Sequence, residues 1–408
     1  MGNPIETKRI LLGLTGSIAC YKAADLASKL SQMGALVDAI LTQSAQQFIT
    51  PLTVQSVTGR RAYTDSDLWG SEGHVLHIGL AQDADLLVIA PATANTLAKM
   101  AYGIADNLLS VTALAARCPI LVAPAMDGGM YAHPATQANL EALRQRGVTI
   151  IGPVAGHLAS GQSGIGRMAE PTELVGQIRL LLAKDGPLKG RKIVVTAGGT
   201  QEPLDPVRVI SNRSSGKQGF ALTQAALDQG AQVDLISAPV HLETPAGARR
   251  VNVFTAEAML SAVINSIEQA DALLMAAAVA DFKPAHVSAQ KIKKDSGPPL
   301  VELEATPDIL KIIAEHKSKS GYPKVTVGFA AESQKVIAGA GSKLAAKRLD
   351  LIIANDITAA DGGFGADTNR VSLLNTRGEV ENLPLMSKYE VAEAVLERVL
   401  AILQEQSR

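Results

Sequence analysis

One polar, glycine-rich stretch of the chain, residues 196–219, has the composition of a phosphate-binding connection. Its sequence is TAGGTQEPLDPVRVISNRSSGKQG, and it joins an apolar, strand-like run to a helix-like run. Backbone N–H groups at a helix N-terminus attract anions, and glycine lets an anion approach them closely. The stretch matches neither Gly-x-x-x-x-Gly-Lys-Ser/Thr nor Gly-x-Gly-x-x-Gly. It predicts a nucleotide that takes part in chemistry, with a solvated loop and an ordinary helix cap as the alternative.

Three connections in the first half also follow strand-like runs and carry small or polar residues. They are residues 13–22, 90–96 and 123–131. The carboxyl ends of parallel strands share one edge of a sheet, so these connections describe a single ligand crevice. The hydroxyl and amide groups of the second connection could hydrogen-bond the edge of a flat heteroaromatic ligand. A glycine that only relieves crowding between strand and helix would give the first connection the same appearance.

Charged residues of the second half suit a nucleoside triphosphate. Asp281 ends an apolar run, and residues 291–294 place three lysines in a loop rich in Ser, Gly and Pro. Lys343 and Lys347 are spaced i,i+4, so both ammonium groups lie on one helix face and could contact one triphosphate. A strand-capping aspartate and solvated lysines are the alternative.

The composition limits the kind of protein this is. The chain has 408 residues, 47% of them hydrophobic and 3% aromatic, with 35 glycines and a net charge of -1. This length favours two domains, and this charge lacks the basic excess that nucleic-acid binding requires. The two cysteines, Cys20 and Cys118, fit no disulfide or zinc pattern and indicate a reducing cytosol. No apolar run is long enough to span a membrane, so a soluble, cytoplasmic protein is expected.

The elements that must position these residues alternate between strands and helices. Predicted strands are residues 10–15, 36–41, 86–90, 120–123 and 148–151, then 193–197, 233–236, 272–276, 325–329 and 351–354, with a late hairpin at 371–374 and 380–383. Helices fall between them, including 171–183 and a final helix from Lys388 to about Gln404. The pattern predicts an α/β fold with two doubly wound, Rossmann-like parallel-sheet domains. We place the domains at residues 1–184 and 191–408, with 185–190 as the linker.

The first half resembles the homo-oligomeric, flavin-containing cysteine decarboxylases over about residues 8–182. The motifs that carry the resemblance are residues 16–19, 91–95, 124–126 and 156–168. The resemblance implies that FMN oxidises the thiol-bearing carbon of an acylated cysteine, that the thioaldehyde loses CO2, and that reduced flavin returns the hydride. It also implies flavin contacts by Gly16, Ser17, Ser44, Pro91, Thr93, Asn95 and Met126, and substrate contacts by Asp127, Met130 and Arg167.

Histidine positions follow from the same resemblance. A catalytic histidine precedes the strand that leads into the Pro-Ala-Thr-Ala-Asn segment, and His77 occupies that position, with His74 three residues earlier. His133 stands directly before Pro134 and is interpreted as a helix-entry residue. His77 is therefore the predicted catalytic histidine of the first half.

Two residues depart from the decarboxylase pattern. Asp127 stands where many members have asparagine, and an ionised carboxylate cannot donate a hydrogen bond to substrate. Asp127 is then either protonated in the site or directed away from it. Ser160 replaces a cysteine that protonates the enethiolate, and a hydroxyl is a much weaker acid than a thiol. The prediction of decarboxylase activity therefore has an alternative, a flavin-binding regulatory or scaffold half that does not decarboxylate.

The second half resembles the CTP-dependent phosphopantothenoylcysteine synthetases over about residues 190–405. Seven motifs stand in family order: residues 196–198, 202–208, 211–212, 214–217, 278–281, 291–294 and 328–332. The resemblance implies that 4'-phosphopantothenate attacks the α-phosphate of CTP, giving an acyl-cytidylate and pyrophosphate, and that the cysteine amine then displaces CMP. Both halves in this order resemble the bacterial bifunctional coenzyme A biosynthesis proteins, in which the first half converts the ligase product to 4'-phosphopantetheine.

The ligase resemblance also assigns residues. Asn212 would donate to the acyl-cytidylate oxygen during amine attack, and Lys291 would neutralise phosphate charge. CTP and substrate contacts are implied for Ala277, Asp281, Lys291, Pro307, Asp308, Ile309, Phe329, Lys343 and Lys347. Mg2+ is expected with the triphosphate, without identified protein ligands. Trimeric flavin enzymes and dimeric ligases imply a homo-oligomer, and a dodecamer would satisfy both symmetries. A nicotinamide oxidoreductase is disfavoured because neither half has the required glycine motif.

Overall fold

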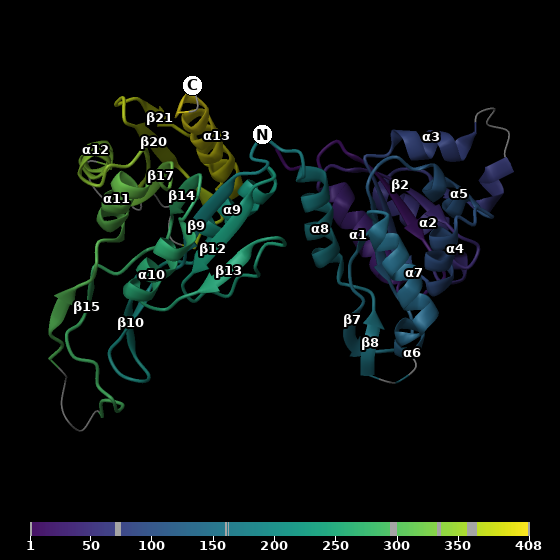
Figure 1. Ribbon diagram of the computed structural model, residues 1–408, viewed down its shortest axis with the longest axis horizontal. Coiled ribbons are helices and arrows are strands. Elements are labelled where there is room, and N and C mark those ends of the chain that lie inside the picture. The colour runs from purple at the N-terminus through teal and green to yellow at the C-terminus, as the bar shows by residue number, and fades with distance from the viewer. Residues whose placement is uncertain are drawn as a thin grey trace. The chain divides into compact units, whose positions relative to one another are not determined.

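The computed structural model describes residues 2–69, 75–159, 161, 163–293, 300–332, 336–356 and 365–406. The chain divides into two compact units, Gly2–Leu182 and Ala183–Arg408, which are drawn in Figure 1 and are described separately below. The predicted 185–190 linker begins just after this division. No described helix is long and apolar enough to cross a membrane.

The first unit is built on a six-stranded parallel sheet. The strand order is β3 (Ala62–Thr64), β2 (Leu36–Leu41), β1 (Arg9–Leu14), β4 (Leu86–Ala92), β5 (Ile120–Pro124) and β6 (Thr149–Ile150). The helices are α1 (Cys20–Gln32), α2 (Pro51–Thr58), α3 (Leu76–Asp83), α4 (Ala94–Tyr102), α5 (Leu108–Ala115), α6 (Gly128–Ala132), α7 (Pro134–Gln145) and α8 (Pro171–Ala183). The strand order reverses between β1 and β4, which is where a doubly wound sheet opens a ligand crevice. The predicted fold class is confirmed for this unit.

The core of this unit covers both faces of the sheet. Successive side chains of a strand point to opposite faces. In β1, Leu12 and Leu14 belong to the cluster that includes Leu26 of α1, whereas Leu11 belongs to the cluster that includes Leu97 of α4. This is why the strands are continuously apolar, and it leaves the ends of the strands as the place for a ligand.

The second unit has an eight-stranded sheet. The order is β13 (Arg249–Asn252), β12 (Gln232–Ser237), β9 (Lys192–Ala197), β14 (Ala272–Met275), β17 (Val325–Glu332), β18 (Leu351–Asp356), β20 (Val371–Asn375) and β21 (Val380–Asn382). The helices are α9 (Lys217–Leu227), α10 (Ala256–Ser266), α11 (Ile309–Ser320), α12 (Val336–Ala346) and α13 (Lys388–Gln406). The first six strands are parallel, and the last two form the predicted antiparallel hairpin. The chain order reverses between β9 and β14.

Two small hairpins extend from the sheet of the second unit. One pairs β10 (Gln201–Pro203) with β11 (Val209–Ser211), and the other pairs β15 (Phe282–Pro284) with β16 (Leu303–Ala305). Figure 1 shows both at the same end of this unit. Residues 196–219 are predicted to form one strand-to-helix connection, but the structure places a hairpin inside it. Leu204 N donates to Arg208 O at 2.9 Å and closes its turn.

Asp271 joins the beginnings of three neighbouring strands in this sheet. It is 6% exposed, and its carboxylate accepts from Arg191 Nη1 at 2.7 Å, Lys192 N at 3.0 Å and Lys324 Nζ at 3.0 Å. Burial opposes the charged form, but these donors outweigh it and hold the pKa of Asp271 below its ordinary 3.8. The carboxylate therefore stabilises the folded state fully above its unfolded-state pKa, and this stabilisation is lost as the pH falls through its lower folded-state pKa.

Replacing Asp271 by Asn is expected to lower the free energy of unfolding at neutral pH by about 2 kcal/mol, because charge-assisted hydrogen bonds are lost. The difference from the wild-type chain should shrink as the pH falls below 3.8. Urea unfolding of the full chain at several pH values measures both effects. Exposed Glu268 supplies the matched control Glu268→Gln, which should leave stability unchanged. A gap between wild type and Asp271→Asn that stays constant with pH would contradict the assignment.

Candidate active sites

A cavity of about 680 Å³ lies in the first unit, at the carboxyl ends of its central strands. Its walls come from the β1–α1, β4–α4 and β5–α6 connections and from the hairpin of β7 (Val154–His157) and β8 (Ser163–Arg167). Predicted residues among its lining are Gly16, Ser17, Thr93, Met126, Asp127, Met130 and Arg167. The volume falls within the range of small-molecule and cofactor sites. The structure thus brings most of the predicted flavin and substrate residues of this half to one cavity.

Gly16 forms a close contact with Ser44 at one end of this cavity. A Cβ atom at Gly16 would lie 2.5 Å from Ser44 Cβ and 3.3 Å from the Ser44 backbone. Only glycine therefore lets the β1–α1 connection approach the loop after β2 so closely. Ser44 itself is absent from the described lining of the cavity. Gly16 is half-buried and Ser44 is exposed, so the candidate place for a phosphate group is beside the pair.

Thr15 joins the first two connections. Its hydroxyl donates to Pro91 O at 2.7 Å and accepts from Thr93 N at 3.0 Å. Thr93 in turn caps α4 by accepting from Thr96 N at 3.4 Å. Pro91 is buried and exposed Asn95 lies on α4, and neither is among the described residues that line the cavity. These two predicted flavin contacts belong to the same connection but are not brought into the cavity of this chain.

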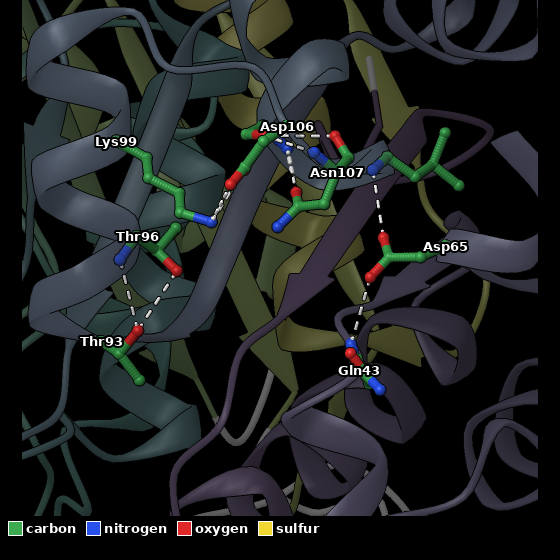
Figure 2. Close-up of polar contacts among 9 residues, drawn as sticks. Gln43, Asp65, Thr93, Thr96, Lys99, Asp106 and Asn107 are labelled. Atoms are coloured by element: carbon green, nitrogen blue, oxygen red, sulfur yellow. Dashed lines mark hydrogen bonds and ion pairs between the residues drawn. The ribbon is translucent and has the colours of Figure 1, made fainter.

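Asp65 braces the loop after β2 that carries Ser44, and Figure 2 shows its contact with Gln43 of this loop. One carboxylate oxygen accepts from Gln43 N at 3.3 Å and the other from Leu108 N, in the first turn of α5, at 3.1 Å. Asn107 caps α5 through a reciprocal pair of bonds with Ser110. The loop after β2 is thereby held against the start of α5.

Replacing Asp65 by Ala should therefore weaken flavin binding by the first half about tenfold, because both acceptors are lost. Titration of the flavin-free protein with FMN, followed by flavin fluorescence, gives the dissociation constant. Exposed Ser66 is the matched control, and Ser66→Ala should bind as the wild type does. Equal dissociation constants for Asp65→Ala and wild type would show that Asp65 does not position the Ser44 loop.

Asp127 begins α6 and also lines the cavity. Its Oδ1 accepts from Gly129 N at 2.9 Å, so one carboxylate oxygen is used as a helix cap. The β7–β8 hairpin lies directly over this connection, because Met126 N donates to Gly166 O at 3.0 Å. Ser160, the predicted proton donor of this hairpin, lies outside the described residues.

The histidines occupy different places. His133 caps α7 by accepting from Ala135 N at 3.2 Å, which confirms it as a helix-entry residue. His77 is a half-buried residue in the first turn of α3, and the described lining of the flavin-half cavity does not include it. His74 lies outside the described residues. Within one chain, the structure does not bring His77 to the other predicted residues.

The structure also reveals lining residues that the sequence analysis does not assign, among them Tyr21, Lys22, Phe48 and His157. The Lys22 side chain is 6% exposed, and Nζ donates to Met168 O at 3.0 Å and to Glu170 Oε1 at 2.8 Å. A lysine among the apolar residues of the first helix is a signal that could have identified it. Nothing in the spacing of Phe48 predicts its place, because it comes from a loop outside the three connections.

A smaller cavity, about 210 Å³, lies at the carboxyl end of β14 in the second unit. Its lining includes seven residues predicted from the ligase resemblance: Ala277, Asp281, Pro307, Asp308, Ile309, Phe329 and Lys347. Lys347 Nζ lies 3.3 Å from Asp308 Oδ1. Lys343 is one helical turn earlier, where its carbonyl accepts from Lys347 N, and it is not among the described lining residues.

Threonine hydroxyls fix the backbone that forms one wall of this cavity. Thr196 Oγ1 accepts from Ala277 N at 3.1 Å, and Thr200 Oγ1 accepts from Ala280 N at 2.9 Å. Both threonines belong to the connection predicted to bind phosphate, but they are fully buried. Their hydroxyls therefore hold the backbone in place. Asn212, exposed at the end of β11, donates from Nδ2 to Val279 O at 3.1 Å. The structure thus places Asn212 at the rim of the predicted nucleotide cavity.

The predicted phosphate-binding groups at the start of α9 and at Lys291 are not among the described residues that line this cavity. The helix α9 begins after Gly216, whose φ is 76°, and no side chain caps its first N–H groups. Lys217 Nζ donates to Gly365 O at 2.8 Å and Asp367 Oδ1 at 2.6 Å. Lys291 is exposed and is not among the described lining residues of the cavity. The described residues contain no group of three or more His, Cys, Asp or Glu side chains that could hold a metal ion.

Comparison with known proteins covers both halves. The flavoprotein family model matches residues 2–182, and the model of the DNA/pantothenate metabolism flavoprotein C-terminal domain matches residues 188–403. The coenzyme A biosynthesis bifunctional protein CoaBC of Bacillus subtilis is 44% identical over 401 residues, covering 98% of each chain. That of Vibrio cholerae is 45% identical over 392 residues, covering 95% of this chain and 97% of the relative.

Among solved structures, the C-terminal domain of a CoaBC protein is 38% identical, covers 54% of this chain and 99% of that chain, and has a TM-score of 0.46. The full-length identities and the two domain matches lead to one conclusion. The chain belongs to the family of bifunctional coenzyme A biosynthesis proteins, with a flavoprotein domain followed by a DNA/pantothenate metabolism flavoprotein C-terminal domain.

Proposed function

We propose that this chain catalyses two successive steps of coenzyme A biosynthesis. The second unit joins cysteine to 4'-phosphopantothenate at the expense of CTP, and the first unit decarboxylates the product to 4'-phosphopantetheine. One observation carries the proposal: seven residues predicted to bind substrate and nucleotide line one cavity in a chain that matches bifunctional relatives along its whole length. Two cysteines outside any pairing motif support a cytoplasmic location.

In the ligase step, the cavity of the second unit would hold only part of CTP. Its 210 Å³ is below the volume typical of whole-ligand sites, so we assign it to the base end of the nucleotide. Asp281, Asp308 and Phe329 then surround the base, and Lys347 contributes positive charge. The triphosphate extends outward with Mg2+ and is neutralised by Lys291 and Lys343.

Amide formation follows at the rim of this cavity. The cysteine amine attacks the acyl carbon of the acyl-cytidylate, negative charge develops on the acyl oxygen, and CMP leaves. A donor that is already in place for that oxygen lowers the barrier. Asn212 is proposed as this donor, because its amide group is exposed and its hydrogen bond to Val279 O fixes it beside the cavity.

In the decarboxylase step, the residues of the first-unit cavity fit FMN. Gly16 and Ser44, which pack closely together, would lie beside the phosphate, and Ser17, Thr93 and Met126 line the adjoining cavity. Bound flavin would supply hydride transfer to and from the thiol-bearing carbon. Arg167 offers positive charge toward an anionic substrate, and Met130 contributes an exposed apolar surface. Asp127 lies at the substrate side of this cavity.

A homo-oligomer would complete the flavin site. His77 is absent from the described cavity lining of its own chain, so a second copy must bring it to a flavin for it to act. The two hairpins of the ligase unit expose Val207, Val209, Phe282 and Leu303, an apolar surface suited to a second copy. Trimeric contacts in the first half and dimeric contacts in the second would together give a dodecamer.

The competing proposal is a flavin-binding half that does not decarboxylate. The observation that favours it is the residue type at position 127: with Oδ1 used to cap Gly129 N, the side chain has no amide NH2 group to donate to a substrate, as an asparagine would have. In this case the ligase alone would be active.

Mass-spectrometric product analysis separates the two proposals. The purified chain is incubated with 4'-phosphopantothenate, cysteine, CTP and Mg2+, after its flavin absorbance has been recorded. Formation of 4'-phosphopantetheine and CO2 supports both activities. Accumulation of phosphopantothenoylcysteine by a flavin-loaded protein supports the ligase with a non-decarboxylating half. Consumption of neither CTP nor cysteine would refute the proposed function.

A further inference from the structure

The two hairpins of the second unit are joined by contacts that have no part in the ligase mechanism proposed for this chain. The turn between β10 and β11 contains Leu204 and Asp205, and the chain beyond β15 passes alongside it. Ser288 N donates to Leu204 O at 3.0 Å, and Ile292 N donates to Asp205 Oδ2 at 3.1 Å. The last bond connects residues 87 positions apart in the sequence.

The Asp205 carboxylate accepts four hydrogen bonds. Oδ1 accepts from Val207 N at 2.8 Å and from Arg208 N at 2.7 Å, which fixes the turn of its own hairpin. Oδ2 accepts from Arg208 Nη1 at 2.9 Å and from Ile292 N. One oxygen therefore holds the turn, and the other holds the loop that follows β15.

Asp205 is buried although it lies on a hairpin with exposed apolar residues. Its side chain is 0% exposed, whereas Val207 beside it is 63% exposed. Burial alone would raise the pKa of Asp205, but the backbone N–H groups of Val207, Ile292 and Arg208 and the charge of Arg208 lower it. A buried carboxylate that stays ionised in this way requires all its donors in place.

The bonded loop segment adjoins Lys291. Ile292 N belongs to the peptide group that contains the Lys291 carbonyl, so Asp205 fixes the backbone on one side of that lysine. Arg208 Nη1 also donates to Ile292 O at 3.0 Å, which fixes the following peptide group. The same hairpin ends at Asn212, whose amide contacts Val279 O at the cavity rim. Asp205 is therefore one of three described links, with Leu204 and Arg208, between the hairpin that leads to Asn212 and the loop that carries Lys291.

We infer that Asp205 is a positioning residue for the ligase reaction, which holds the Lys291 loop in register with the hairpin that carries Asn212. This inference rests on the proposed function, because it assigns to Asp205 the placement of a lysine that neutralises phosphate. A misplacement of about 1 Å in such a group costs on the order of 100-fold in rate. Asp205 itself touches neither nucleotide nor substrate in this arrangement.

The first test is Asp205→Asn in the full chain. Asparagine keeps the shape of the side chain but presents an NH2 group to one set of N–H donors. Either the β10–β11 turn or the loop that follows β15 therefore loses its hydrogen bond. Pyrophosphate release from 4'-phosphopantothenate, CTP and Mg2+ in the absence of cysteine should slow about 10–100-fold. CMP, which lacks the outer phosphates, should bind with an unchanged dissociation constant. His286→Gln, an exposed change on the same extension, is the matched control and should release pyrophosphate at the wild-type rate.

A double-mutant cycle with Lys291→Gln distinguishes positioning from general stabilisation. If Asp205 acts through Lys291, Asp205→Asn will cost little further rate once Lys291 has been replaced. Equal fractional losses in both backgrounds, or a wild-type rate for Asp205→Asn, would overturn the inference. A wild-type chain that releases no pyrophosphate would instead refute the proposed function.

A second variant tests the same bond from the other side and serves if Asp205→Asn does not fold. Ile292→Pro removes the backbone N–H that contacts Asp205 Oδ2 and leaves the carboxylate in place. The inference is supported if Ile292→Pro slows pyrophosphate release in the otherwise wild-type chain but causes little further slowing once Lys291 has been replaced by Gln. Wild-type pyrophosphate release by Ile292→Pro would overturn it.

Discussion

Replacing Asn212 by Asp is expected to lower the rate of phosphopantothenoylcysteine formation by about 100–1,000-fold, while pyrophosphate release from CTP continues. The amide N–H groups of Asn212 are the proposed donors for the oxygen that becomes negative when the amine attacks, and removal of one such donor costs a factor of this size. Aspartate supplies a carboxylate instead, which repels the developing charge. It would also face Val279 O, to which Asn212 Nδ2 donates at 3.1 Å.

Rapid quenching of the reaction, followed by mass spectrometry, measures this result. The acyl-cytidylate should accumulate in Asn212→Asp, because its formation is spared and its consumption by cysteine is slow. Asn265, exposed on α10 of the same unit, provides the matched control Asn265→Asp, with the same loss of an amide at a distant site. Unchanged turnover in Asn212→Asp would remove Asn212 from the mechanism.

Replacing Gly16 by Ala should weaken the binding of FMN to the first unit about 10–100-fold. The new methyl group would lie 2.5 Å from Ser44 Cβ, a distance at which the two loops must separate. Overpacking of this kind costs about 1–3 kcal/mol, which corresponds to the stated loss of affinity. The separation would also move Ser44 away from the phosphate group that is proposed to bind beside the pair.

Flavin content after purification and FMN titration of the flavin-free chain both measure this effect. Gly341 lies on α12, and a Cβ atom there would make only an ordinary contact, 3.6 Å from Leu374 Cδ2. Gly341→Ala is therefore the control for a glycine-to-alanine change as such, and it should retain wild-type flavin affinity. Wild-type affinity in Gly16→Ala would show that phosphate binding does not depend on the close contact between Gly16 and Ser44. The ligase rate should be unaffected by Gly16→Ala, because the flavin belongs to the other unit.

The strand and helix pattern could be predicted because local sequence carries it. Apolar runs of four to seven residues that alternate with helical segments give the succession of most strands and helices along the chain, although the short strands β3 and β13 are not predicted. The predicted final hairpin is present as β20 and β21, since short runs separated by a turn pair with each other. The sequence also predicts the residues of the second-unit cavity, because Ala277 and Asp281 follow β14 and Phe329 lies on β17, its parallel neighbour.

Long-range contacts could not be predicted in this way. The β10–β11 hairpin lies inside a segment whose glycines and polar residues suggest a simple connection, and Asp205 finds Ile292 only after the sheet has formed. Lys22 belongs to the flavin-half cavity because its Nζ meets Met168 O, 146 positions later. His77 shows the converse, since motif spacing predicts it but its own chain does not bring it to the described cavity lining.

The sequence by itself determined two α/β units, the residues that follow each strand, and a family resemblance specific enough to predict both activities. These features depend on periodicity and on motifs, which are properties of neighbouring residues. The tertiary structure alone decided that Gly16 approaches Ser44, that Asn212 lies against Val279, and that Asp205 holds the Lys291 loop. These contacts join residues from separate elements, so they exist only once burial of the apolar faces has fixed the sheet and the connections at its edge.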